Sequence, residues 1–215
     1  MTDYRSSIKS GIIWNAVASF ARYGLQFAAV MILARLLTPD DYGLVGVLTV
    51  FITVADALVD SGLGGAVVKK ANATDIDFST LTVYNFFVSA IIYLLYYYSA
   101  PYVADYYNMP ELTGLMRLYA LTILVYALTV APRAYLTKCL RFKAIALLNT
   151  FAGAIALVVA IILAYNDFGP YTIVWQYLIN SIIFSVGTIF MAKYKFSLRF
   201  SWESFKEQFN FGFYT

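Results

Sequence analysis

The chain contains, at residues 42–68, the apolar run YGLVGVLTVFITVADALVDSGLGGAVV. An α-helix of about 20 mostly apolar residues is long enough to cross the hydrocarbon layer of a membrane. Comparable runs recur through the 215 residues, of which 61% are hydrophobic and only 13% are charged. A soluble domain of this length needs more polar surface. The sequence therefore predicts an all-α polytopic membrane protein.

Short polar connectors separate the apolar runs, and the pattern predicts six membrane spans. Thr38, Pro39 and the acidic residues after them favour a helix start at the second span. Pro132 is expected to kink or end the fourth span, because proline removes a backbone donor. The expected spans are residues 11–35, 42–68, 80–104, 114–136, 144–165 and 170–192, which make residues 11–192 a six-helix lobe.

Two shorter segments flank this lobe. Residues 1–10 form a short polar N-terminus. After the sixth span, Trp202, Phe205 and Phe209 share one face of a helix and charged residues take the other, which predicts an interfacial helix within residues 193–209. Residues 210–215 read as the start of a truncated seventh span, so we expect the chain to be one lobe of a larger protein.

Basic residues alternate between the connectors, and this alternation predicts the orientation in the membrane. Connectors on the cytoplasmic side carry most of the lysine and arginine of a membrane protein. The N-terminus and every second connector hold twelve basic residues, whereas the remaining connectors hold only Arg35. We therefore expect a cytoplasmic N-terminus. The twelve are Arg5, Lys9, Lys69, Lys70, Arg133, Lys138, Arg141, Lys143, Lys193, Lys195, Arg199 and Lys206.

Polar residues line one face of each of the first two spans. Residues spaced at i, i+4, i+7 and i+11 fall on the same side of an α-helix. A charge at mid-membrane is costly and normally faces protein or water, so these faces are expected to border a polar cavity. The residues are Asn15, Ser19, Arg22 and Gln26 in the first span and Thr49, Thr53, Asp56 and Asp60 in the second.

Arg22 has two interpretations that overlap. It can form an internal ion pair with Asp56 that only neutralises both charges. Alternatively, Arg22 lines the cavity and attracts an anionic group, while Asp56 or Asp60 modulates it. A buried ion pair can also act as a switch, so the sequence leaves both interpretations open.

Other spans offer weaker signals. Small residues at every fourth position favour close helix packing, which predicts a packing face along the fifth span. In the sixth span, Gln176 and Asn180 share a side, where they serve either interhelical hydrogen bonds or cavity lining. Tyrosines near the outer end of the third span are typical of an interfacial belt, with sugar stacking as the alternative. The packing face consists of Ala152, Ala156, Ala160 and Ala164.

Several classes of function lack support in the sequence. The chain has no histidine and a single cysteine, Cys139. It shows no cluster of metal ligands and no set of catalytic groups, so we expect neither a metal, nor a cofactor, nor an enzyme. Nucleic-acid binding is not expected, because the basic residues are scattered in short loops beside the spans.

Several stretches resemble one family. Residues 33–45 read LARLLTPDDYGLV, residues 60–70 read DSGLGGAVVKK and residues 11–15 read GIIWN. Later, residues 198–200 and 202–207 read LRF and WESFKE. Together they resemble the polysaccharide transporter family, the Wzx-like O-antigen (lipopolysaccharide) flippases of the multidrug/oligosaccharidyl-lipid/polysaccharide exporter superfamily.

The resemblance implies an architecture, a substrate and partners. It implies two six-helix lobes, as in MATE-like transporters, around a cavity that opens alternately to each side. The substrate would be an undecaprenyl-pyrophosphate-linked oligosaccharide in a bacterial or archaeal cytoplasmic membrane. Arg22 would engage the pyrophosphate, and Asp56 or Asp60 would couple transport to H⁺ or Na⁺. Membrane lipid, polysaccharide polymerases and glycosyltransferases are the implied partners.

Three alternatives compete with a flippase. A cation-coupled drug antiporter of the same superfamily would favour an acidic cavity, and Arg22 argues against it. A membrane-embedded glycosyl- or acyltransferase would need catalytic groups that the sequence does not gather. A non-transporting scaffold in polysaccharide assembly would leave glycan translocation normal in its absence.

Overall fold

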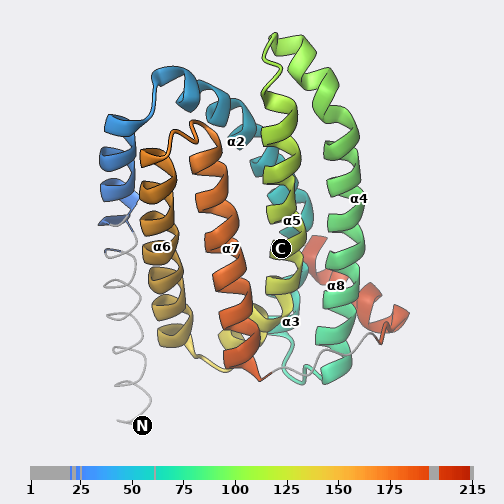
Figure 1. The fold of residues 1–215 in the computed structure, drawn as a ribbon. Coiled ribbons are helices and arrows are strands. Elements are labelled where there is room, and N and C mark those ends of the chain that lie inside the picture. Colours follow the sequence, from blue (N-terminus) through green and yellow to red (C-terminus); the bar gives the residue numbers. More distant parts are fainter. Residues whose placement is uncertain (1–19, 21–22, 25, 61, 194–198, 214–215) are drawn as a thin grey trace.

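The computed structural model describes residues 20, 23–24, 26–60, 62–193 and 199–213 (Figure 1). All regular secondary structure among these residues is helical. Within this part of the chain, five helical stretches are long and apolar enough to cross a membrane, counting Pro39–Lys69 as one. The predicted polytopic, all-α membrane protein is confirmed. The helices are Gln26–Leu36, α2 (Pro39–Asp60), α3 (Leu63–Lys69), α4 (Asp75–Tyr107), α5 (Leu112–Lys138), α6 (Phe142–Tyr165), α7 (Tyr171–Ala192) and α8 (Trp202–Phe213).

The predicted spans from the third to the sixth fall within an observed helix or start one residue before it. The second predicted span is interrupted. Gly62 has a φ of 72° and separates α2 from α3, a left-handed conformation that glycine adopts without a steric penalty. Only Gln26–Leu36 of the first predicted span forms a continuous described helix, and most of its N-terminal part lies outside the described residues.

Pro132 does not end the fourth predicted span, which corrects one of the two outcomes expected for it. Helix α5 continues to Lys138. Pro132 is buried, and its neighbours Ala131 and Ala134 pack in a core cluster with residues of α3 and α4. Tertiary packing of this kind supports a helix against a local proline. The cost of the missing backbone donor is therefore offset by packing around it.

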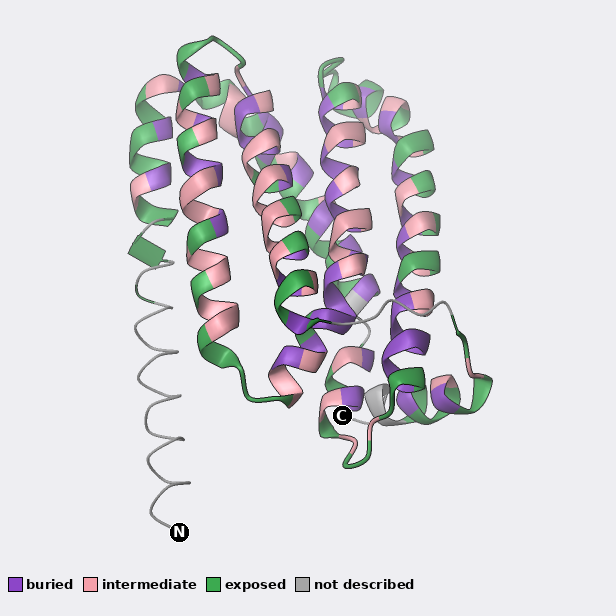
Figure 2. Ribbon diagram, turned by 60° about the horizontal axis from the view of Figure 1, so that its bottom comes forward, coloured by how far each residue is buried: buried purple, intermediate pink, exposed green. Residues whose placement is uncertain are grey.

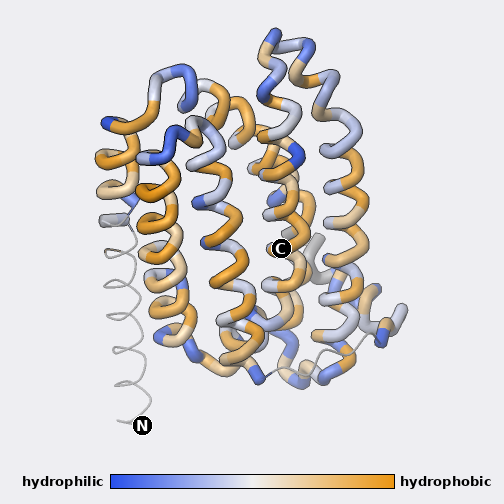
Figure 3. The backbone as a smooth tube through the Cα atoms, in the orientation of Figure 1, coloured by the Kyte–Doolittle hydropathy of each residue, from blue (hydrophilic) through white to orange (hydrophobic). Residues whose placement is uncertain are grey.

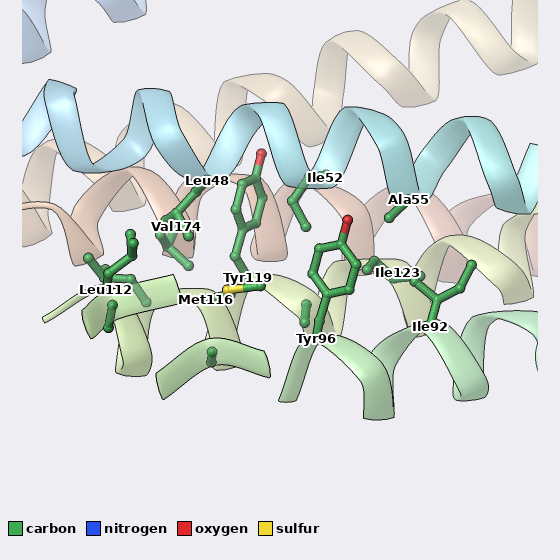
Figure 4. Packing of buried hydrophobic residues seen from close by; sticks show 14 of the residues in the cluster. Leu48, Ile52, Ala55, Ile92, Tyr96, Leu112, Met116, Tyr119, Ile123 and Val174 are labelled. Carbon is green, nitrogen blue, oxygen red and sulfur yellow. The ribbon is translucent and has the colours of Figure 1, made fainter. Parts of the chain in front are cut away.

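Helix α5 lies at the centre of the bundle and contacts α2, α4, α6 and α7. Its buried side chains meet those of α2, α4 and α7 in the largest core cluster (Figure 4). Tyr96 of α4 points its hydroxyl toward α2 and donates a hydrogen bond to the carbonyl of Phe51. Burial of a large apolar cluster stabilises the bundle, and the satisfied tyrosine hydroxyl fixes α4 against α2.

The predicted alanine face of α6 is buried, as its spacing indicates. Ala160 and Ala164 pack with Leu33 of the Gln26–Leu36 helix and with Ile173 of α7. The outer surfaces of α4 and α6 carry exposed residues (Figure 2), and many of these are large and apolar, a pattern that suits contact with lipid. Hydrophilic residues gather toward the two ends of the bundle (Figure 3).

One end of the bundle, which we call the basic end, contains the junction of α3 with α4 and that of α5 with α6. Lys138 donates hydrogen bonds to the carbonyls of Val68, at 3.3 Å, and of Lys70. Arg141 donates to the carbonyl of Met191 at the end of α7, at 3.1 Å. Cations at helix C-termini satisfy carbonyls that have no partner within the helix. These basic residues therefore stabilise helix ends.

Helix α8 docks at the basic end through a polar cluster. The Asp77 side chain is only 1% exposed and accepts hydrogen bonds from Lys70 Nζ, at 3.0 Å, and from Ser204 Oγ. Lys70 Nζ also contacts Glu207 Oε2 at 2.8 Å. Gln208 Nε2 donates to the Asp77 carbonyl at 3.1 Å and to Ser204 Oγ at 2.8 Å. We call Lys70, Asp77, Ser204, Glu207 and Gln208 the α8 clasp.

The aromatic face predicted for the last helix is only partly buried. Phe205 stacks on Tyr84 of α4, with ring centroids 5.1 Å apart. Trp202 stays 69% exposed, and Phe209 is also exposed. The face that enters the protein is instead the polar pair Ser204 and Gln208, because Asp77 lies buried opposite them.

A candidate ligand cavity

A cavity of about 390 Å³ lies between the Gln26–Leu36 helix, α2, α6 and α7. Small-molecule sites commonly enclose about 300–1,000 Å³. The lining combines aliphatic side chains with polar ones, and no charged side chain occurs among the described residues that line it. The polar lining residues are Gln26, Tyr42, Thr49, Asn149, Thr150, Gln176, Tyr177 and Asn180.

The helical spacing of α6 and α7 brings most of these groups to the cavity. Gln176 and Asn180 are one turn apart on α7, and Asn149 and Gly153 are one turn apart on α6. On α2, a side chain added at Gly46 would meet nothing within 4 Å. The absence of a side chain at Gly46 therefore helps to keep this space open.

Two buried polar atoms of the lining have no hydrogen-bond partner among the described residues. They are the hydroxyl oxygen of Tyr42 and Oδ1 of Asn180. By contrast, Thr49 donates to the Val45 carbonyl at 2.8 Å, and Thr150 donates to the Ala146 carbonyl at 3.1 Å. The two unpaired atoms have almost no accessible surface, so the polar character of the cavity comes from the lining residues as a set.

The structure places some of the predicted cavity residues at this site and not others. Gln26 and Thr49 line the cavity. Thr53 donates to the Thr49 carbonyl at 2.7 Å and is not part of the lining. Asp56 is exposed on α2 and is also not part of the lining. Asn15, Ser19, Arg22 and the side chain of Asp60 lie outside the described residues.

Sequence reasoning left Gln176 and Asn180 between two roles, and the structure places both at the cavity. It overlooked Tyr42, Asn149 and Tyr177. A signal for Asn149 was present, since it precedes Gly153 and Ala156 on one face of an otherwise apolar helix. Tyr42 gave no signal, because a tyrosine at a span end is typical of a membrane interface.

The lining groups suit hydrogen bonding to neutral molecules. Each amide both donates and accepts, as does each hydroxyl. The described lining contains no carboxylate, thiol, imidazole or amine that could act as a strong acid, base or nucleophile. No group of three or more metal-ligating side chains occurs in the described part of the chain.

A family model described as "Polysaccharide biosynthesis protein" matches residues 32–215 of the chain. The lipopolysaccharide biosynthesis protein WzxC of Escherichia coli (strain K12) is 26% identical over 210 residues, which are 97% of this chain and 43% of WzxC. The teichuronic acid biosynthesis protein TuaB of Bacillus subtilis (strain 168) is 26% identical over 156 residues, 73% of this chain and 32% of TuaB.

A third relative is the succinoglycan biosynthesis transport protein ExoT of Rhizobium meliloti (strain 1021). It is 21% identical over 188 residues, which are 87% of this chain and 38% of ExoT. The chain thus spans less than half the length of the curated relatives described. No solved structure shows significant similarity to it.

Proposed function

Because this chain belongs to the family of polysaccharide biosynthesis proteins, we propose that it supplies one lobe of a flippase for lipid-linked oligosaccharides. The substrate is an undecaprenyl-pyrophosphate glycan that crosses the cytoplasmic membrane for surface polysaccharide or lipopolysaccharide synthesis. ExoT is named as a transport protein, and WzxC and TuaB are named as biosynthesis proteins. The proposal gives this chain a task of the same kind.

The observation that carries the proposal is a polar cavity among helices long enough to cross a membrane. An unpaired polar group in hydrocarbon costs several kcal/mol, so a hydrated glycan cannot cross lipid unaided. A cavity lined by amides and hydroxyls replaces part of the lost hydration. Because the outer surfaces of the helices are apolar, the lipid tail stays in the bilayer.

The proposed cycle is alternating access between two lobes around a site near the midplane of the membrane. The basic end faces the cytoplasm, in agreement with its lysines and arginines. Arg22 attracts the pyrophosphate; at helical spacing it would precede Gln26 by one turn. Asp56 or Asp60 couples the cycle to H⁺ or Na⁺, and polymerases and glycosyltransferases act before and after it.

The test is a strain whose surface polysaccharide depends on this protein. Arg22→Glu should abolish surface glycan and leave lipid-linked oligosaccharide in the cytoplasmic leaflet, because like charges repel the pyrophosphate. Arg22→Lys, which keeps the charge, should retain most export. Surface glycan is measured by labelling intact cells, with the amount of protein in the membrane compared by immunoblot. Normal export by Arg22→Glu would contradict the anionic part of the mechanism.

A further inference from the structure

We propose that the cavity binds an uncharged sugar residue of the glycan, through its hydroxyl or acetamido groups, and that the pyrophosphate binds elsewhere. This inference rests on the proposed flippase function and specifies which part of the substrate enters this site. It also makes the cavity a determinant of which glycan is accepted.

The charge of the lining favours a neutral ligand. The described lining residues are all uncharged, whereas a pyrophosphate in a region of low dielectric constant needs cationic partners. The polar lining consists instead of amides from three helical segments, represented by Gln26, Asn149 and Gln176, and of hydroxyls. Sugar hydroxyls both donate and accept hydrogen bonds, and so do these groups. The chemistry of the lining therefore fits neutral sugar groups better than phosphate.

The lining also surrounds the cavity from several sides. Its polar residues come from the Gln26–Leu36 helix, α2, α6 and α7. A sugar residue carries several hydroxyls around one ring, so it can form hydrogen bonds with polar groups from more than one helix.

The size of the cavity and its aromatic wall also fit a sugar residue. About 390 Å³ fits a small part of an oligosaccharide at the lower end of ligand-site volumes. Tyr177 lines the cavity and stacks on the buried Tyr119, with ring centroids 5.4 Å apart. A ring held in this way offers an apolar surface to the carbon–hydrogen face of a sugar, next to the amides that bind its hydroxyls.

The experiment compares three substitutions at Asn180 in the glycan-export strain. Asn180→Leu should lower export about tenfold, because it replaces an amide of the cavity lining with an apolar side chain. Asn180→Asp and Asn180→Lys should both lower export at least as much, since either charge is unfavourable in a cavity whose described lining is uncharged. Asn85→Leu on α4 is the matched control: Asn85 Oδ1 is also buried and unpaired, but Asn85 does not line the cavity, so export per protein should stay at the wild-type level.

The outcomes separate this inference from the proposed function. Wild-type export by Asn180→Leu overturns the sugar site and leaves the flippase function intact. Export that Asn180→Lys retains and Asn180→Asp loses also overturns it, in favour of a bound pyrophosphate. If the wild-type gene fails to restore surface glycan to a deletion strain, the proposed function itself fails.

A binding measurement covers the case in which the Asn180 variants do not fold. In a Cys139→Ser background, Gly46→Cys places a thiol at the cavity wall and Gly43→Cys places one elsewhere on α2. The neutral oligosaccharide released from the strain's own glycan should slow maleimide labelling at position 46 and leave position 43 unchanged. Protection by inorganic pyrophosphate, without protection by the neutral oligosaccharide, would overturn the inference.

Discussion

The cavity and the α8 clasp both gather polar side chains, but they differ in charge and in pairing. In the clasp, the buried carboxylate of Asp77 accepts hydrogen bonds from Lys70 and Ser204. In the cavity, the described side chains are neutral, and the Tyr42 hydroxyl and Asn180 Oδ1 have no partner. Polar groups that pair with one another hold helices together, whereas polar groups around an empty volume are available to a ligand.

An unpaired buried atom does not by itself mark a ligand site. Gln208 Oε1 in the clasp and Asn85 Oδ1 on α4 are buried without partners as well, yet neither residue lines the cavity. An isolated unpaired acceptor is a local cost in free energy. The cavity is the candidate site because polar residues from four helical segments line the same empty volume.

The largest expected effect on stability comes from breaking the clasp at its centre. Asp77→Ala should lower the free energy of unfolding by about 3 kcal/mol, because it removes the buried acceptor that Lys70 and Ser204 share. Unfolding of the purified protein in detergent, followed by circular dichroism, measures this loss. Asp75→Ala is the control, since Asp75 is an exposed acid in the same first turn. Equal losses for the two variants would show that the clasp contributes little.

Filling the cavity should affect glycan export much more than stability. Gly46→Leu should lower glycan export by about tenfold or more while leaving the free energy of unfolding nearly unchanged, because the new side chain enters open space and replaces a helix-weakening glycine. Gly43→Leu is the matched control, since Gly43 also has open space around its Cβ position but does not line the cavity. Surface glycan per amount of protein is the measurement. Normal export by Gly46→Leu would mean that this void is not on the substrate path.

The bundle could be predicted from the sequence because membrane spans are encoded locally. Apolar length and short connectors suffice to place α4 to α7, and small residues at fixed spacing marked the buried face of α6. The same local reasoning went too far at Pro132, where packing from other helices supports α5.

The partners of a polar face could not be predicted, because periodicity does not say which helix it meets. Ser204 and Gln208 lie one turn apart on α8. Nothing in that spacing reveals that Asp77, far away in the sequence, accepts a hydrogen bond from each of them. Gln176 and Asn180 likewise remained ambiguous until α6 and α2 were placed around them. Tertiary contacts decide whether the polar face of a helix binds another helix or lines a ligand site.

Two amides test this difference directly. Asn180→Leu should change the free energy of unfolding by less than about 1 kcal/mol, because the oxygen it removes is unpaired. Gln208→Leu should cost about 1–2 kcal/mol, because Gln208 donates to the Asp77 carbonyl and to Ser204. The same unfolding assay measures both variants. A larger loss for Asn180→Leu than for Gln208→Leu would reverse the roles assigned to the two regions.

The smallest expected effect concerns the exposed edge of the clasp. Glu207 is largely exposed, so Glu207→Gln should cost only about 0.5 kcal/mol at neutral pH. The hydrogen bond from Lys70 to Glu207 outweighs desolvation and raises the pKa of Lys70 above its usual 10.5. The stability that this pair contributes is therefore complete below pH 10.5 and is lost as the pH rises through the folded-state pKa. The difference in unfolding free energy between wild type and Glu207→Gln should vanish at that alkaline limit, and Glu203→Gln should show no such pH dependence. A difference that persists where Lys70 is neutral would show that Glu207 contributes to stability through contacts other than its ion pair with Lys70.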